Sequence, residues 1–325
     1  MNSLLNTLAL FVIATGAALH PAPAGAQDYP TRPITVVIPT TSGTAADIAA
    51  RTLAPRLGQI LGKPLVVENR TGASGNIAVA SVVKAPPDGH TILLTASTLS
   101  VSPVLFKDLG WDPVKDLQPV ARMASITYVL LVHPSVPATS VRELVALAKQ
   151  KPGALNFGSP GAGTPHQLIM EQFKQAAGIN ITHIPYKGTA QAMTDLMGGR
   201  VETAFFPVHT SAQLAKAGKL RMIASVGDKR TPWTPELPTL NEQGVSGVDA
   251  DVWIGMFAPR GTPAAIYNRL SHEVLTLLNL PETRETLFQQ GIVVNASGPD
   301  DLAVLLKNDI ERYRRIVSQA KITLE

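Results

Sequence analysis

Short runs of β-branched residues alternate with helix-type stretches along most of the chain, and this alternation limits the fold more than any other feature. Residues 34–39 (ITVVIP) have the composition of a buried strand. Residues 45–61 follow with apolar side chains near helical spacing. Such alternation is typical of βαβ units and parallel sheets. Because 325 residues exceed what one ordinary core requires, the pattern predicts an α/β protein of two lobes.

The predicted elements form two series that meet near residue 127. The first series has strands and helices at 34–39, 45–61, 65–68, 76–84 and 91–95. The second series has them at 128–132, 141–150, 155–158, 166–177, 181–184, 190–197, 202–206, 211–217 and 221–226. A proline-rich passage at 231–239 then precedes a strand at 252–258 and two closing helices at 264–278 and 300–319.

This order predicts two doubly wound sheets joined by a hinge that the chain crosses twice. We assign residues 27–126 to lobe 1, 127–228 to lobe 2, and 229–325 to a return into lobe 1. Two crossings leave a cleft between the lobes, which is a layout suited to closure around a ligand.

Residues 1–26 have the features of a secretory signal peptide. An apolar run at 8–19 is followed by small residues and by Ala24-Gly25-Ala26, which predicts cleavage before Gln27. No Lys or Arg precedes this run, and about twelve apolar residues are too few to span a bilayer. The chain has no cysteine, which excludes a disulfide framework, a thiolate nucleophile and cysteine-based metal sites.

Two segments at strand-to-helix junctions are rich in Ser, Thr and Gly. In residues 39–47 (PTTSGTAAD), Thr44 and Asp47 have capping-box-like spacing, which predicts a helix start near Ala45. In residues 158–166 (GSPGAGTPH), we expect Thr164 to be the N-cap, followed by proline as the first helical residue. Ligands of open α/β sheets bind beyond the carboxyl ends of strands, where such loops lie.

The chemistry of these two segments favours an anion. Each helix start offers unpaired backbone N–H groups and the positive end of a helix dipole. Glycine allows close approach of the backbone, and Ser or Thr hydroxyls add donors. Hydrogen bonds to a charged group contribute about 1.5–3 kcal/mol each, whereas micromolar binding requires roughly 8 kcal/mol. No dedicated arginine is therefore required, although the alternative remains that both segments are only well-formed helix caps.

The sequence does not match the patterns of common enzymes or nucleic-acid-binding proteins. Residues 157–161 (FGSPG) have Phe157 where a nucleophile elbow requires glycine. A hydrolase built on Ser159 and His166 is a weak alternative, because no neighbouring carboxylate is an obvious third member. No phosphate loop, dinucleotide fingerprint or metal-ligand histidine spacing is present, so we expect no cofactor and no metal. The net charge of +4 is scattered rather than gathered in a basic stripe.

Short motifs in order along the chain resemble the Bug-type receptors of tripartite tricarboxylate transporters, which are periplasmic solute-binding proteins of Gram-negative bacteria. These motifs are residues 29–34 (YPTRPI), 66–70 (VVENR), 87–89 (PDG), 111–116 (WDPVKD), 132–137 (VHPSVP), 156–159 (NFGS), 184–188 (IPYKG) and 257–259 (FAP). No single motif is decisive, but so many in order are specific, and they cover nearly the whole mature chain.

The resemblance implies two α/β lobes of the type II periplasmic-binding-protein plan. It also implies that the two loops hold a ligand carboxylate through main-chain amides, hydroxyls and water, while other strand-end residues line the cleft. The expected ligand-binding residues are Thr40, Thr41, Ser42, Gly43, Thr44, Ser97, Thr98, Ser159, Gly161, Gly163, Thr164, His166, Tyr186, Thr189 and Phe206.

Two departures from the family pattern bear on the ligand. The first loop has fewer Pro and Gly than is usual, and Ala46 stands where the family has Thr or Ser before Asp47. The family often has Asp-Asn after the strand that ends at Phe205, whereas residues 206–209 are FPVH here. An Asp there would pair with an amino group, so its absence predicts a small organic acid without an ammonium group.

The resemblance thus implies a monomeric periplasmic receptor, not an enzyme, that delivers this acid to inner-membrane transporter subunits. A second interpretation is a sensory binding protein that reports the ligand to a membrane signalling protein. Both use lobe closure as the output, and the sequence does not separate them.

Overall fold

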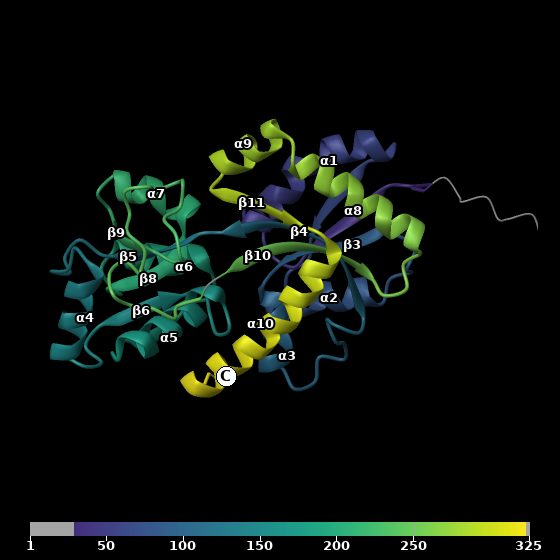
Figure 1. The fold of residues 1–325 in the computed structure, drawn as a ribbon. Coiled ribbons are helices and arrows are strands. Elements are labelled where there is room, and N and C mark those ends of the chain that lie inside the picture. Colours follow the sequence, from purple (N-terminus) through teal and green to yellow (C-terminus); the bar gives the residue numbers. More distant parts are fainter. Residues whose placement is uncertain (1–28, 250, 323–325) are drawn as a thin grey trace, which may run out of the picture.

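The computed structural model describes residues 29–249 and 251–322, which form two α/β lobes, each built around one sheet (Figure 1). Lobe 1 has six strands in the order β11-β4-β10-β3-β1-β2, and lobe 2 has five in the order β7-β6-β8-β5-β9. The strands of lobe 1 are β1 (Ile34–Ile38), β2 (Leu65–Asn69), β3 (Thr91–Ala96), β4 (Leu117–Ile126), β10 (Val252–Pro259) and β11 (Ile292–Ser297). Those of lobe 2 are β5 (Tyr128–Val132), β6 (Asn156–Ser159), β7 (Thr182–Pro185), β8 (Thr203–Pro207) and β9 (Arg221–Ser225). The predicted two-lobed α/β fold is confirmed, and the predicted signal peptide lies outside the described residues.

Helices cover both faces of the lobe 1 sheet, which explains why β1 is almost continuously apolar. Val36 and Ile38 face one core and Val37 faces the other, as alternate residues of a strand must. The first core includes α1 (Ala45–Leu61), α8 (Ala264–Leu278) and α9 (Pro281–Gln289). The second includes α2 (Asn76–Val83), preceded by a short 3₁₀ turn at Ala73–Gly75, together with α3 (Thr98–Leu105) and α10 (Pro299–Ala320).

Lobe 2 is layered in the same way. Leu130 and Phe205 pack toward α4 (Val141–Gln150) and α5 (Pro165–Ala177). Leu131 and Phe206 pack toward α6 (Thr189–Met197) and α7 (Val208–Lys216). Within the described residues, no helix has the length and apolar content needed to cross a membrane.

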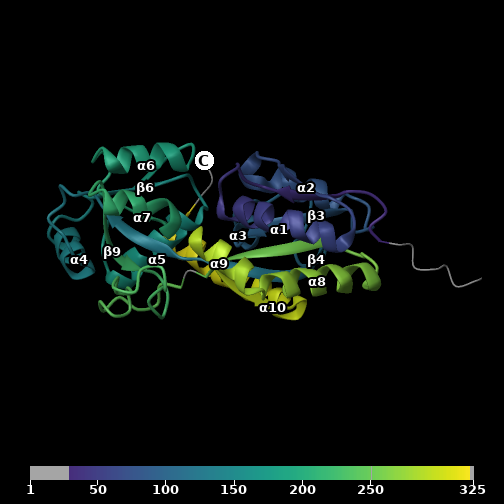
Figure 2. The ribbon, with the colours of Figure 1, turned by 90° about the horizontal axis from the view of Figure 1, so that it is seen from above.

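The sheets are mixed rather than purely parallel, because the chain enters lobe 2 and returns. It leaves lobe 1 after β4, passes through Thr127 into β5, and comes back along residues 226–249 and Asp251 into β10. β10 is antiparallel to β3 and β4, and β5 is antiparallel to β8 and β9. Seen from above, the two lobes lie side by side with the crossing strands between them (Figure 2).

Four elements of lobe 1 are absent from the sequence-based prediction: α3, β4, α9 and β11. The prediction that only two helices close the chain is wrong, because α9 and β11 lie between them. α9 buries only Thr283 and Leu287, so it has almost no apolar periodicity to detect. α3 contains Pro103 and small polar residues, which conceal its helical character.

Apolar side chains join the lobes on one side of the hinge. Leu168 of α5 packs with Val101 of α3 and with Tyr313 and Ile316 of α10. The last helix of the chain, α10, therefore packs against both lobes. A second contact between the lobes is made by Trp233 Nε1, which donates to the carbonyl of Phe288 in α9.

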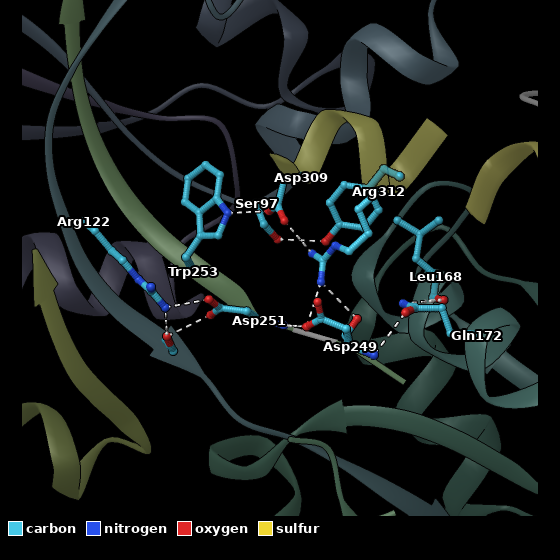
Figure 3. Close-up of polar contacts among 11 residues, drawn as sticks. Ser97, Arg122, Leu168, Gln172, Asp249, Asp251, Trp253, Asp309 and Arg312 are labelled. Carbon is cyan, nitrogen blue, oxygen red and sulfur yellow. Dashed lines mark hydrogen bonds and ion pairs between the residues drawn. The ribbon is translucent and has the colours of Figure 1, made fainter. Parts of the chain in front are cut away.

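A polar network surrounds the second crossing (Figure 3). Asp251 accepts from Arg122 Nη2 at 2.6 Å and from the Ser125 hydroxyl at 3.0 Å, both on β4 beside the first crossing. The amide of Asp249 donates to Gln172 Oε1 in α5 of lobe 2 at 3.2 Å. These contacts tie the two crossings to each other and to lobe 2.

Candidate functional site

Loop 1 (residues 39–44) connects β1 to α1 and turns at Gly43, whose φ of 83° favours glycine. The amide of Gly43 donates to Asp47 Oδ2 at 2.9 Å. Burial opposes the ionisation of Asp47, but hydrogen bonds from Arg51, Gly43 and Asn69 outweigh it and hold the pKa of this carboxyl below its usual value. The buried, ionised carboxylate of Asp47 thus fixes the turn at Gly43 by accepting its amide.

Thr44 occupies the N-cap position of α1, but its side chain caps no amide there. Its hydroxyl donates to the carbonyl of Thr41 at 3.2 Å and lies 2.8 Å from the Thr40 hydroxyl. The capping-box prediction is therefore only half right: the acidic residue reaches back, but to Gly43, and the threonine hydroxyl organises the loop instead.

Asn69, at the end of β2, connects the back of loop 1 to the sheet. Its Nδ2 donates to the carbonyl of Thr40 and to Asp47 Oδ1, both at 3.0 Å. Its Oδ1 accepts from the Ser42 hydroxyl at 3.2 Å and from Arg51 Nη2 at 2.9 Å. The sequence reasoning missed this residue, although its place directly after a strand was a signal.

Loop 2 (residues 159–164) connects β6 to α5 and repeats the construction of loop 1. Gly163 has a φ of 74°, and its amide donates to Gln167 Oε1 at 2.8 Å. The hydroxyl of Thr164, at the N-cap position as predicted, donates to the carbonyl of Gly161 at 2.8 Å. Pro165 is the first helical residue, as the sequence predicted.

Ser159 is paired with His183 of β7 and not with His166. Its Oγ lies 2.7 Å from His183 Nε2, and neither ring nitrogen of His166 has a hydrogen-bond partner in the described residues. The Ser159–His166 pair on which the weak hydrolase alternative depends is therefore not formed. The reason is that β6 and β7 are neighbours in register, which sets Phe157 opposite His183.

His166 is buried among aromatic rings at the start of α5. It makes edge contacts with Tyr128 and Phe206, at centroid distances of 5.1 and 4.9 Å. Burial lowers the pKa of His166 to about 3, so the ring is neutral.

The remaining expected residues follow the carboxyl ends of other strands. Ser97 is fully buried after β3, with the Tyr313 hydroxyl 3.4 Å from its own, and Thr98 begins α3. In lobe 2, the amide of Tyr186 donates to the carbonyl of Ser159 at 2.9 Å, and Thr189 begins α6.

Loop 2 meets α3 across the lobes. A Cβ on Gly163 would lie 2.2 Å from Leu105 Cδ1, so the backbone of loop 2 touches α3 directly. The structure thus sets loop 2 of lobe 2 against the far end of α3 from Ser97 and Thr98. Leu105 was missed from sequence because α3 was not predicted.

The two loops have chemistry for holding an anion. The amides of Ala45, Ala46 and His166, in the first turns of α1 and α5, have no acceptor among the described residues. No group of three or more potential metal ligands occurs in the described part of the chain.

A family model described as "Tripartite tricarboxylate transporter family receptor" matches residues 49–322. The chain is 31% identical to Protein BugT of Bordetella pertussis, with 100% of this chain and 99% of BugT covered.

Solved structures are similar over most of their length. Rpa4515 of R. palustris with adipate superposes with a TM-score of 0.83 at 36% identity, covering 91% of this chain and 99% of that one. The periplasmic binding protein BugD gives 0.80 at 31% identity, with 91% and 100% covered. MatC of Rhodopseudomonas palustris with bound malate gives 0.79 at 29% identity, with 89% and 100% covered.

Proposed function

Since this chain belongs to the tripartite tricarboxylate transporter receptor family, we propose that it is a periplasmic receptor that captures a small organic acid between loop 1 and loop 2. The observation that carries this proposal is the matched construction of the two loops. Each has a left-handed glycine at the helix start, a hydroxyl that folds the loop, and a side chain at the fourth residue after that glycine that accepts its amide. Loops built alike in the two lobes suit a ligand shared between them.

Backbone amides supply the attraction for a carboxylate. The unpaired amides of Ala45, Ala46 and His166 lie in first helical turns, where the helix dipole favours negative charge. At about 1.5–3 kcal/mol per hydrogen bond to a charged group, a few such contacts approach the roughly 8 kcal/mol of micromolar binding. The ligands of the related structures, adipate and malate, are carboxylates.

The ligand class is an organic acid without an ammonium group. Residues 206–209 (FPVH), which span the end of β8 and the start of α7, supply no carboxylate. Asp47, the acidic residue of loop 1, is already bound by Gly43, Asn69 and Arg51. An ammonium group would therefore have no free carboxylate partner at either loop, and its desolvation would cost free energy.

We propose that the receptor is a monomer that is exported to the periplasm, cleaved before Gln27, and delivers its ligand to inner-membrane transporter subunits; the family description supports this proposal. Mass spectrometry of the exported protein tests that cleavage site. Loss of export on deletion of residues 1–26 supports the proposed location, and export without them contradicts it.

Isothermal titration tests the receptor proposal with adipate and malate against aspartate and glutamate. We expect a simple dicarboxylate to bind with micromolar or better affinity and the amino acids far more weakly. Thr44→Val and Thr164→Val should each weaken binding by about tenfold, because each removes a hydroxyl that shapes a loop. Tight binding of aspartate or glutamate instead would contradict the ligand class, and unchanged affinity in both variants would contradict the two-loop site.

The geometry at Ser159 argues against the hydrolase alternative. The Ser159 hydroxyl donates to the carbonyl of Gly161 at 3.1 Å and lies 2.7 Å from His183 Nε2, so its one proton is already directed at a backbone carbonyl and not at a base. We expect no turnover of p-nitrophenyl esters by the wild-type protein. Turnover by the wild type that is lost in Ser159→Ala would instead support the hydrolase alternative.

A further inference from the structure

Loop 1 is held by a chain of side chains that returns to the sheet. Gly43 donates its amide to Asp47 Oδ2, and Asp47 Oδ1 accepts from Asn69 Nδ2 at 3.0 Å. The same Nδ2 donates to the carbonyl of Thr40 at 3.0 Å. These hydrogen bonds form a relay, which runs from Gly43 to Asp47 in α1, then to Asn69 on the adjacent strand β2, and back to Thr40 in the loop.

Loop 2 is held by an equivalent relay with different residues. Gly163 donates its amide to Gln167 Oε1 at 2.8 Å, and Gln167 Nε2 lies 3.2 Å from His183 Nδ1. His183 Nε2 lies 2.7 Å from Ser159 Oγ, and the Ser159 hydroxyl donates to the carbonyl of Gly161 at 3.1 Å. In lobe 2 the strand that supplies the supporting side chain, His183, is β7, just as β2 supplies Asn69 in lobe 1.

The loop 2 relay permits only one placement of its protons. A backbone amide can only donate, so the Gln167 atom that faces Gly163 is the oxygen, and the amide nitrogen faces His183. His183 Nδ1 must then accept, which leaves the ring proton on Nε2. That proton is donated to Ser159 Oγ, and the serine proton goes to Gly161.

The surroundings of His183 keep its ring neutral. The ring stacks on Phe157 at 4.6 Å, with the ammonium group of Lys174 5.4 Å from the centre of that phenyl ring and itself paired with Glu171. Burial, reinforced by the charge of Lys174, lowers the pKa of His183 to about 4. A protonated ring would turn an Nδ1–H donor toward the Gln167 amide donor, and the relay would break.

We propose that Asn69 and His183 are positioning residues that hold loop 1 and loop 2 in their ligand-binding conformations, and that loop 2 requires the neutral Nε2–H form of His183. This inference rests on the proposed function. In lobe 1 the corresponding carboxylate, Asp47, stays ionised because its pKa is lowered by hydrogen bonds that outweigh its burial.

Nitrogen-15 NMR of the histidine rings tests the tautomer without any ligand. His183, assigned by loss of its signals in His183→Gln, should be the Nε2–H tautomer at pH 7 and should remain neutral at pH 5.5. An Nδ1–H tautomer, or titration near the ordinary histidine value of about 6.5, would overturn the inference.

Titration with adipate tests the positioning role in the full mature protein at pH 7.5. His183→Phe keeps the stacking on Phe157 but removes both ring nitrogens, and should weaken binding by about tenfold or more. His183→Gln keeps a donor toward Ser159 and should recover part of this loss. Asn69→Ala should weaken binding similarly, while His133→Gln, at a surface histidine remote from both loops in sequence and bonded to Ser135, should not.

The outcomes distinguish failure of the positioning roles from failure of the proposed function. If wild-type protein binds adipate and the Phe and Ala variants bind equally well, the positioning roles are wrong and the proposed function stands. If the Phe and Gln variants lose affinity equally and melt at equally lowered temperatures, the role is structural only and the inference is overturned. If the wild type binds neither adipate nor malate, the proposed function fails and takes the positioning role with it.

Discussion

Arg312 Nη1 in α10 lies 2.9 Å from the carboxylate of Asp249 in the second crossing between the lobes (Figure 3). Its Nη2 lies 2.9 Å from Asp309 Oδ1, one turn earlier on the same helix. Asp309 is buried and also accepts from Trp253 Nε1 at 2.6 Å. The Arg312 guanidinium thus joins the last helix to the second crossing, and Asp309 joins the same helix to Trp253 of β10.

Replacing Arg312 with Met should destabilise the protein by roughly 3 kcal/mol, because it leaves the buried Asp309 without its cation. Urea unfolding followed by tryptophan fluorescence measures the change. Arg314→Met is the matched control on the same helix, since its pair with Glu311 is exposed and should contribute less than about 1 kcal/mol. Equal effects of the two variants would show that the buried pair of Arg312 with Asp309 adds no more stability than the exposed pair of Arg314 with Glu311.

Asp309 should make stability depend on pH between about 4 and 6. Burial raises the pKa of Asp309 to about 6, despite the opposing charge of Arg312. The folded state therefore holds the carboxyl proton of Asp309 more tightly than the unfolded state does. The resulting contribution to the free energy of unfolding is fully present below about pH 4 and is lost as pH rises through about 6. The stability of wild type relative to Asp309→Asn should therefore fall over this window by at most about 3 kcal/mol. A difference that stays constant from pH 4 to pH 7 would contradict the raised pKa.

His166→Phe should stabilise the protein toward acid. The ring nitrogens of His166 are buried without partners, and removing them should add about 1 kcal/mol at pH 7. Burial lowers the pKa of His166 to about 3. The pH-dependent part of the free energy of unfolding that comes from keeping this ring neutral is therefore fully present above about pH 6.5 and is lost as pH falls toward 3. Thermal melts from pH 7 to pH 4 should show a shallower loss for His166→Phe than for wild type. His272→Gln, at an exposed position, should leave the slope unchanged, and an identical slope in His166→Phe would contradict the prediction.

Gly163→Ala should weaken ligand binding more than a comparable substitution at another left-handed glycine. Gly163 and Gly178 have φ values of 74° and 63°, so alanine costs each about 1–2 kcal/mol in backbone strain. Only at Gly163 does the added Cβ meet another side chain, Leu105 of the other lobe. We expect Gly178→Ala to lower the melting temperature with little change in adipate affinity, and Gly163→Ala to lower both. Partial recovery of affinity in Gly163→Ala with Leu105→Ala would confirm the contact, whereas equal affinities of the two single variants would exclude it.

The sequence alone determined the elements whose signals are local. Residues 45–61 and 141–150 were predicted with the bounds that α1 and α4 have, because apolar spacing, caps and terminal glycine act between neighbours in the chain. The start of α5 at Pro165 was predicted for the same reason. The two Ser, Thr and Gly segments were also identified, since strand-to-helix junctions follow directly from element order.

Only the tertiary structure decided which side chains from distant segments contact those loops. His183 lies 24 residues from Ser159 and reaches it because β7 is the neighbour of β6. Leu105 meets Gly163 because the two lobes pack at α3, and Asn69 reaches loop 1 because β2 pairs with β1. Periodicity within a segment does not specify strand order or register, so contacts between distant segments are set when the sheets form and the lobes pack together.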